Sequence, residues 1–406
     1  MKKNTLFHIN LFVLIGVNFS FAQYENKTIE ISSSILPIVE IPKKFINQKL
    51  NNKTMKTVEQ FMSNAKFNIG FYNVEDIIQI PGTNWIVGGG ITCYGPNFWD
   101  KVITTGYWHL FDAEKETGFR VDSSSIKIAA EEDRFPLTTP PTWSAFSPHG
   151  FDFHNQIETT IEVYVASHAS ASGESREAVE VFRIDYSEEI PTFTWIGGID
   201  VAEDFWPDAV ALLPDGGVVA TSTGNPLMPQ EESMKLALKG APIGNTRVWY
   251  KSNGWQDIEG SENISTPNGI VISEDGQQIY VAASTGFSVV KIDRTESPVK
   301  VTSMDLGGIP DNLRWSADGK SILAGIHVVD EPLDFAKQQE VAAAYGGNQM
   351  TAFKVTRIDP ETLELTEVMP AAVYGVLGAG TSAIEVGNRI WVGSTKSDRV
   401  GIFDLK

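Results

Sequence analysis

The sequence has little cysteine and no excess of basic charge, and both shortages narrow what the protein can be. Its 406 residues include one cysteine, Cys93, so no disulfide can form within the chain. A lone cysteine is more often a small buried apolar residue than a reactive one. Lys and Arg total 32 against 51 Asp and Glu, a formal net charge of −19 at pH 7. Nucleic-acid binding depends on clustered Lys and Arg, so no nucleic-acid partner is expected.

Several sequence motifs of well-known catalytic sites are also missing. The chain contains no GxSxG elbow, no Walker loop, no HExxH and no pair of CxxC motifs. Serine hydrolase, nucleotide-dependent and zinc chemistry therefore have no support in the sequence.

Long hydrophobic runs are scarce, and the longest one lies at the N-terminus. Met1-Lys2-Lys3 precedes a mainly apolar run from Leu6 to Ala22. Ser20-Phe21-Ala22 forms a small-x-small cleavage site, so residues 1–22 are predicted to be a signal peptide. We expect the protein to be exported, periplasmic or secreted, with no transmembrane segment after signal removal. A retained anchor is disfavoured because the run is short and carries three polar residues, His8, Asn10 and Asn18.

Glycine and turn residues are plentiful, and they mark a recurring hairpin pattern. In residues 266–283 an amide, Asn268, precedes a short aliphatic strand, an Asp-Gly turn and a second strand ending in small residues. Asp-Gly suits the positive φ of a tight hairpin turn. The pattern recurs from Asp208 and from Asp311, and in all three copies the opening residue lies seven positions before the turn aspartate.

Three weaker copies bring the number of repeats to six. They run from Glu75 to Gly82, from Thr381 to Asn388, and from His149 with Asn155-Gln156 near its turn. The opening residues of successive copies are separated by 43 residues (Asn268 to Asp311) to 74 residues (Glu75 to His149). Strand-rich repeats of this length are typical of β-propellers, so we predict an all-β, six-bladed β-propeller.

The repeats also suggest how the chain is divided. We predict one propeller domain over residues 67–406, preceded by an extension over residues 23–66. Strand-like stretches at 28–31 and 35–41 of the extension offer a strand that can close the ring with the last blade. Two insertions, 225–245 and 328–349, can be either a lid over the centre or solvated crossovers.

The opening residues of the six repeats predict a central site. The inner strands of a propeller begin at one face around a common axis, so their first residues point toward the same spot. These residues are Glu75, His149, Asp208, Asn268, Asp311 and Thr381. Oxygen donors of this kind select Ca²⁺ or Mg²⁺ over softer metals, so a central calcium site is expected. The alternative is that they are ordinary turn and strand-end residues.

Six short motifs give the chain a family resemblance over residues 73–405. They are Glu75-Asp76, Pro148-His149-Gly150, Ser167-His168, Pro267-Asn268-Gly269-Ile270, Asp311-Asn312 and Gly325-Ile326-His327. In this order and spacing they resemble the calcium-dependent paraoxonase/arylesterase family and, more distantly, the gluconolactonase and regucalcin group, all six-bladed propellers.

The resemblance implies two calcium ions. The residues that it assigns to a catalytic calcium are Glu75, Asn268, Asp311 and Asn312. Those that it assigns to a structural calcium are Asp76, Asp208 and the backbone of Phe151. Pro207 stands where the family usually offers an asparagine, so water or a shifted Asp208 would have to complete the shell of the catalytic ion.

The resemblance also implies a catalytic histidine pair, His149 and His168, and a pocket histidine, His327. The resulting hypothesis is an ester hydrolase, a lactonase or arylesterase, that acts on a small-molecule lactone or ester. Ca²⁺ would polarise the carbonyl while His149 activates water. Two alternatives stay open: a sugar-lactone hydrolase with a carboxylate base such as Asp311, and a non-catalytic ligand- or partner-binding propeller. The sequence does not indicate the oligomeric state.

Overall fold

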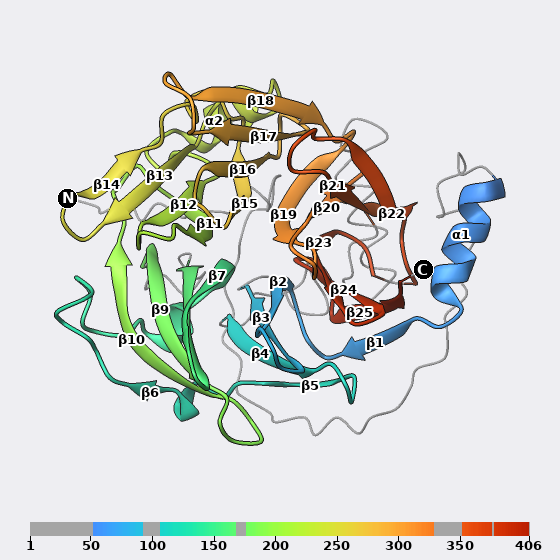
Figure 1. Ribbon diagram of the computed structural model, residues 1–406, viewed down its shortest axis with the longest axis horizontal. Coiled ribbons are helices and arrows are strands. Elements are labelled where there is room, and N and C mark those ends of the chain that lie inside the picture. The colour runs from blue at the N-terminus through green and yellow to red at the C-terminus, as the bar shows by residue number, and fades with distance from the viewer. Residues whose placement is uncertain (1–51, 92–105, 168–175, 329–350, 376, 406) are drawn as a thin grey trace.

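Six sheets of mainly antiparallel strands surround a central axis in the computed structural model of the protein (Figure 1). The structure describes residues 52–91, 106–167, 176–328, 351–375 and 377–405. The all-β, six-bladed propeller predicted from the repeats is therefore confirmed. Within the described ranges, no helix is both long and apolar enough to cross a membrane.

Each blade follows the chain from its inner strand outward. Blade 1 contains β2 (Val74–Gln79), β3 (Trp85–Gly90), β4 (Tyr107–Asp112) and β5 (Thr117–Arg120). Blade 2 contains β7 (Pro148–Ile157), β8 (Thr160–Ser167), β9 (Ala178–Asp185) and β10 (Thr192–Asp200), with β6 (Lys127–Ile128) at its outer edge. Blade 3 contains β11 (Pro207–Leu212), β12 (Val218–Ser222), β13 (Asn245–Tyr250) and β14 (Gly254–Asp257).

The remaining blades have the same order. Blade 4 contains β15 (Pro267–Ile272), β16 (Gln278–Ala283), β17 (Ser288–Asp293) and β18 (Lys300–Asp305). Blade 5 contains β19 (Ile309–Trp315), β20 (Ile322–His327), β21 (Phe353–Ile358) and β22 (Leu365–Ala372). Blade 6 contains β23 (Gly380–Val386), β24 (Arg389–Ser394) and β25 (Arg399–Asp404).

An early strand closes the ring. β1 (Lys66–Ile69) pairs antiparallel with β25 and becomes the outer strand of blade 6, and the Phe67 ring meets Phe403 edge-on at 5.9 Å. Pairing removes the exposed edge that β25 would otherwise present. Helix α1 (Asn52–Met62) precedes this strand and packs Phe61 against Tyr374 at 6.2 Å. The stretches 28–31 and 35–41, which we considered for closure, lie outside the described residues.

The Asp-Gly hairpin turns have the expected backbone. Gly216, Gly276 and Gly319 have φ values of +90°, +73° and +69°, which glycine adopts without strain. In the His149 copy, Asn155-Gln156 lies near the turn, as predicted, but residues 158–159 form the turn itself. There β7 runs on to Ile157, and a bulge lies between His154 and Ile157. The extra residues of this longer hairpin are absorbed by the bulge, so the turn comes later.

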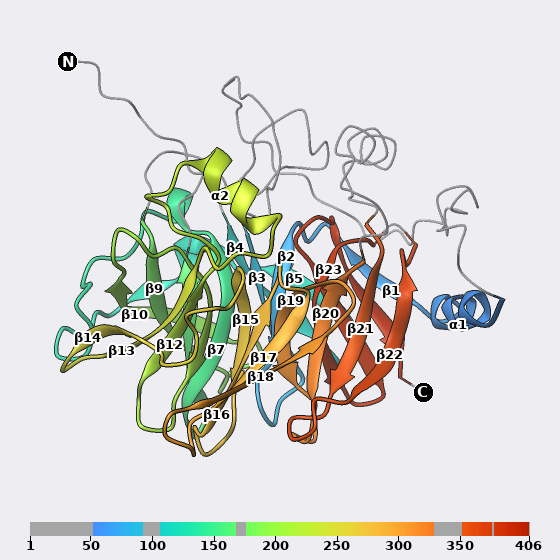
Figure 2. The ribbon, with the colours of Figure 1, turned by 90° about the horizontal axis from the view of Figure 1, so that it is seen from above.

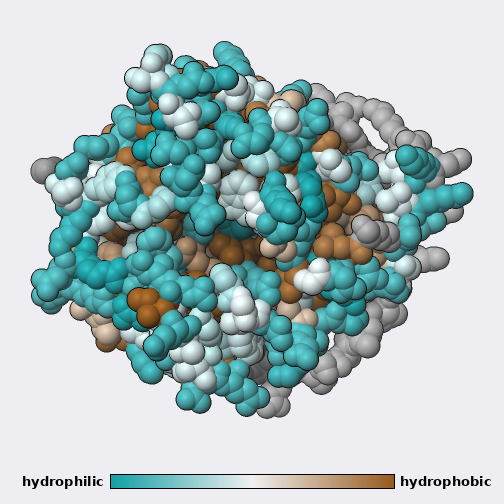
Figure 3. Space-filling view, in the orientation of Figure 1, coloured by the Kyte–Doolittle hydropathy of each residue, from teal (hydrophilic) through white to brown (hydrophobic). Residues whose placement is uncertain are grey.

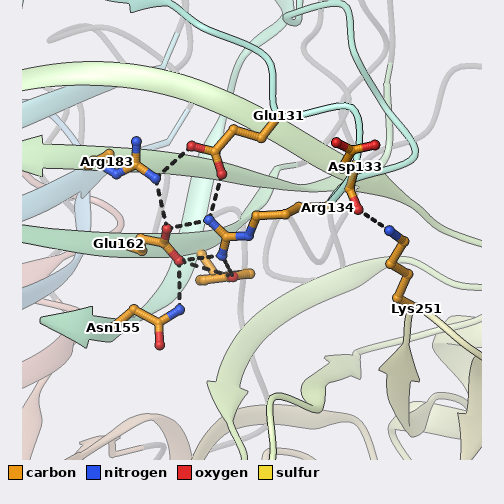
Figure 4. A network of polar contacts seen from close by, with 8 residues as sticks. Glu131, Asp133, Arg134, Asn155, Glu162, Arg183 and Lys251 are labelled. Atoms are coloured by element: carbon orange, nitrogen blue, oxygen red, sulfur yellow. Dashed lines mark hydrogen bonds and ion pairs between the residues drawn. The ribbon is translucent and has the colours of Figure 1, made fainter.

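A network of ion pairs stabilises the outer part of blade 2 (Figure 4). Arg134 donates to both carboxylate oxygens of Glu162, at 2.6 and 2.7 Å, and to Glu131 at 2.7 Å. Arg183 joins the same two carboxylates at 2.7 and 3.1 Å. Bidentate pairs of this kind are stronger and more directional than single ion pairs. The network attaches the segment that carries Glu131 and Arg134 to β8 and β9, so we regard it as structural.

The insertion between β12 and β13 lies on the face at which the inner strands begin (Figure 2). It contains α2 (Gln230–Ala237), and Ala237 and Ile243 pack on Trp206, just before β11. The other insertion lies outside the described residues after Val328. Whether either insertion acts as a lid stays a prediction. On the molecular face seen in Figure 3, most residues are hydrophilic and hydrophobic residues gather toward the middle.

Candidate functional site

The opening residues of the six repeats converge on the axis and are buried. Their exposed fractions do not exceed 4%, and they are Glu75, His149, Asp208, Asn268, Asp311 and Thr381. The Asn312 amide donates to Glu75 Oε1 at 2.5 Å, and Thr381 Oγ1 donates to the Glu75 carbonyl oxygen at 2.5 Å. Side chains from blades 5 and 6 therefore both bind Glu75 of blade 1 at the axis.

A bulge in every inner strand directs these side chains. In all six blades the pairing between the first and second strands shifts register within the first residues, at or next to the opening residue. Bulges re-aim side chains and are frequent near functional sites. Glycine then allows neighbouring strands to approach: a Cβ on Gly269 would lie 2.4 Å from the Asp311 carbonyl oxygen. The bulges and glycines of the inner strands thus bring the opening residues together in a single cluster at the axis.

The electrostatics of the cluster favour a cation. Burial, and then the charges of Asp311, Asp76 and Asp208, raise the pKa of Glu75 well above its usual value. Burial followed by Asp208 and Asp76 does the same to the pKa of Asp311, which Asn268 moderates. Unpaired buried charges are costly, so carboxylates that raise one another's pKa in this way fit a bound cation.

Unsatisfied polar atoms point in the same direction. Glu75 Oε2 and both amide atoms of Asn268 are buried and have no hydrogen bond of normal geometry. Buried polar groups normally have partners, so the two oxygens, Glu75 Oε2 and Asn268 Oδ1, fit ligands of an ion. The donors are all oxygens, which suits Ca²⁺. Across the described ranges, however, no three His, Cys, Asp or Glu side chains are already arranged as a metal-binding group.

Asp208 belongs to this cluster. Pro207 opens β11 as Pro267 opens β15, which places a residue without a backbone N–H donor at the first position of each strand. The carboxylate that follows raises the pKa of both Glu75 and Asp311, so it faces both. Whether Asp208 would complete the shell of a catalytic calcium stays a prediction.

The residues assigned to a structural calcium do not fit a second ion. Arg314 pairs with the Asp76 carboxylate and donates from Nη2 to the Phe151 carbonyl oxygen at 2.8 Å. The Asp76 carboxylate and the Phe151 carbonyl would both have to bind the ion. The third expected ligand, Asp208, instead lies with Glu75 and Asp311. A guanidinium therefore stands where this ion was expected.

Two histidines face carboxylates at the axis. His149 Nδ1 lies 3.6 Å from Asp208 Oδ1, and His327 Nε2 lies 3.6 Å from Asp311 Oδ2. Burial lowers the pKa of His327 to about 4, so this ring is neutral at pH 7. His168 lies outside the described residues, and its pairing with His149 stays a prediction.

Sequence reasoning missed two buried cations near the axis. Lys396 follows β24, is 4% exposed, and its charge lowers the pKa of both Asp311 and His327. Arg314 had a signal in the repeat register, because the equivalent positions of two other copies hold Val271 and Ala211. A basic residue at a position that is aliphatic in these two copies indicates a special contact across the axis.

Comparison with known proteins gives one matching family model and a set of similar solved structures. Residues 233–393 match the Arylesterase family model. Similar solved structures include a luciferin-regenerating enzyme (11% identity, 84% of this chain and 95% of that chain, TM-score 0.42). Another is the PQQ-bound aldose sugar dehydrogenase from Streptomyces coelicolor (11% identity, 84% and 98%, TM-score 0.44). No curated protein sequence matches the chain.

The matched region contains the site residues that blades 4 and 5 contribute. It includes blades 4 and 5 with Asn268, Asp311, Asn312 and His327, but neither Glu75 nor His149. The match indicates an ester hydrolase. Over residues 233–393 this six-bladed propeller resembles the arylesterases, in agreement with the family resemblance seen in the sequence.

Proposed function

We propose that the protein is an exported, calcium-dependent hydrolase of lactones or aryl esters. The observation that carries the proposal is the buried cluster of Glu75, Asp208 and Asp311, whose negative charges face one another on the axis. The family match over residues 233–393 supports ester hydrolysis. Export rests on the N-terminal sequence alone, and a mature N-terminus at Gln23 would support it.

Four residues would hold the ion: Glu75, Asn268, Asp311 and Asn312. When bound, Ca²⁺ would polarise the ester carbonyl and stabilise the oxyanion. The Asn312 amide, which now donates to Glu75, would turn its oxygen inward. These oxygens come from three blades, so the substrate carbonyl would be oriented along the axis.

His149 is the proposed general base. A proton on Nδ1 would face Asp208, 3.6 Å away, and leave Nε2 with the lone pair that accepts a proton from water. Asp208 then favours the imidazolium that forms. The role of Asp208 is thus to position and charge-stabilise His149, as carboxylates do beside other basic histidines.

A carboxylate base is the second candidate. The raised pKa of Asp311 brings its carboxyl group closer to the range useful for proton transfer, and His327 lies 3.6 Å from it. This arrangement would suit a sugar-lactone hydrolase in which His149 is dispensable.

A substrate panel tests the proposal. The purified protein is assayed on aryl esters, aliphatic lactones and aldonolactones in calcium, in chelator, and after calcium is restored. We expect hydrolysis of at least one ester or lactone class, lost in chelator and recovered with calcium. Absence of activity on the whole panel at saturating calcium would refute the proposed function.

A further inference from the structure

We infer that the guanidinium of Arg314 replaces a second axial cation, so that the cluster of Asp76, Arg314 and the Phe151 carbonyl oxygen binds no metal. Arg314 comes from blade 5 and is 7% exposed. It pairs with Asp76 of blade 1, and its Nη2 donates to the Phe151 carbonyl oxygen of blade 2 at 2.8 Å. One fixed positive charge thus joins three inner strands across the axis.

The remaining hydrogen-bonding capacity of these groups is largely used. Asp76 Oδ1 accepts the N–H of Ile77 at 2.9 Å, and Asp76 Oδ2 accepts the N–H of Phe151 at 3.1 Å in addition to Arg314. Nη1 of Arg314 donates to the Leu313 carbonyl oxygen at 3.1 Å. A divalent ion would have to displace the guanidinium to reach the same oxygens, because two cations cannot share them without strong repulsion.

The position of Asp208 is consistent with this inference. A second ion near Asp76 would need a further carboxylate, but Asp208 lies beside His149 and faces Glu75 and Asp311. Three carboxylates, those of Glu75, Asp208 and Asp311, therefore gather in one cluster, whereas Asp76 is paired with an arginine. The expectation that one ion binds rests on the calcium site proposed above. The expectation that no metal binds beside Asp76 and Arg314 does not depend on that proposal.

Calcium stoichiometry of the full chain tests the inference first. After removal of loosely bound metal, calorimetric titration with Ca²⁺ and elemental analysis should find no more than one ion per chain. Two ions would overturn the inference. No bound calcium at all would refute the calcium step of the proposed function, and Arg314 would then be judged by the stability measurements alone.

Thermal unfolding in excess chelator is the second arm. Arg314→Met should lower Tm by about 5–10 °C, because it leaves the buried Asp76 carboxylate without its partner. Arg357→Met is the matched control: Arg357 pairs with Glu385 away from the axis and is one-third exposed, so its loss should shift Tm by about 2 °C or less. An Arg314→Met variant that melts with the parent would contradict the inference.

A milder variant covers failure to fold. Arg314→Lys keeps the charge but lacks the planar fork that contacts Asp76 and Phe151 together, so it should lose less stability than Arg314→Met. If both variants melt with the parent, the arginine does not link the blades. If neither variant folds, the calcium count of the parent decides.

Discussion

At the scale of single residues, the site is organised by histidines and carboxylates that lie slightly beyond hydrogen-bond distance. Both the His149–Asp208 and the His327–Asp311 pairs are separated by 3.6 Å. Such contacts often tighten only when substrate binds. The first pair links blades 2 and 3, whereas the second lies within blade 5. The two pairs are therefore not equivalent, and substitution can separate their roles.

His149→Gln tests the proposed base. The variant should keep its fold and calcium affinity but lose about a hundred-fold or more in kcat/KM, the usual scale for general-base catalysis. His154→Gln, on the same strand and only partly buried, is the control and should hydrolyse at the parent rate. Near-parent turnover by His149→Gln, combined with loss of turnover in Asp311→Asn at saturating calcium, would favour the carboxylate base instead.

Calcium affinity should distinguish charged from neutral ligands. Asp311→Ala removes a carboxylate and should weaken calcium binding more than Asn268→Ala, which removes a neutral amide. Titration calorimetry on the two variants and the parent measures the difference. Equal affinities in all three proteins would mean that the central calcium site is misassigned.

A buried carboxylate outside the axis should make stability depend on pH. Burial raises the pKa of Glu180 from 4.5 to about 7, despite opposing contributions from Arg176 and Trp195. The native protein therefore keeps this proton while the unfolded chain has already released it. Raising the pH from 4.5 to 7 should then lower the free energy of unfolding by about 3 kcal/mol.

Glu180→Gln removes that proton equilibrium. Urea unfolding at pH 5 and pH 8 should show a smaller loss of stability in Glu180→Gln than in the parent. Glu188→Gln, at an exposed position of the same blade, should follow the parent. Identical pH dependence in the parent and Glu180→Gln would show that Glu180 is ionised throughout this range in the native protein.

Much of the site was predictable because it follows the repeat register. Glu75, Asn268 and Asp311 occupy equivalent positions before their turns, and the axis brings them together. The contacts of Arg314 were not predictable in the same way, because they depend on bulges that set side-chain direction and on strands from three blades. The direction in which the Asp208 side chain points was also not predictable, because it too depends on contacts between blades.

At the scale of elements, contacts between inner hairpins hold neighbouring blades in register. Thr221 of β12 shows this most directly. Its Oγ1 accepts the N–H of Ala209 at 3.1 Å and donates to the Asn268 carbonyl oxygen at 2.6 Å. One hydroxyl thus connects the inner strand of its own blade with that of blade 4, next to a proposed ligand.

Thr221→Val should uncouple these strands. The substitution preserves shape but leaves a buried N–H and a buried C=O without this partner, which should cost about 1–3 kcal/mol of unfolding free energy. Urea unfolding measures the loss. Thr302→Val on the exposed strand β18 should change stability by less than about 0.5 kcal/mol. Equal stabilities of the two variants would argue against the connection between blades.

The hairpins themselves were the most predictable elements. Asp-Gly at a fixed distance from the opening residue predicted turns at Gly216, Gly276 and Gly319, because positive φ there is a local requirement. The exact turn of the β7–β8 hairpin was less predictable, because Asn155 also has positive φ, 48°, but within a bulge rather than at the turn. A turn-forming residue does not by itself distinguish these two uses.

At the scale of the whole molecule, a central ion would link blades that are distant in the sequence. Glu75, Asn268 and Asp311 belong to blades 1, 4 and 5. If calcium binds only the folded ring, it stabilises the ring by mass action, by about 2.7 kcal/mol at a concentration of 100 Kd. Chelation should therefore lower Tm, and added calcium should restore it. An unchanged melting curve after verified calcium removal would contradict this prediction.

The strand that closes the ring also makes folding depend on the order in which the chain is synthesised. Lys66 is made more than three hundred residues before its partner Ile402. The partner edge of blade 6 therefore does not exist until translation is almost complete, and such distant pairings slow folding. Nascent chains would present unpaired strand edges, which are prone to aggregation. Losing only β25 would remove no predicted site residue, yet it would leave β1 unpaired and the ring open.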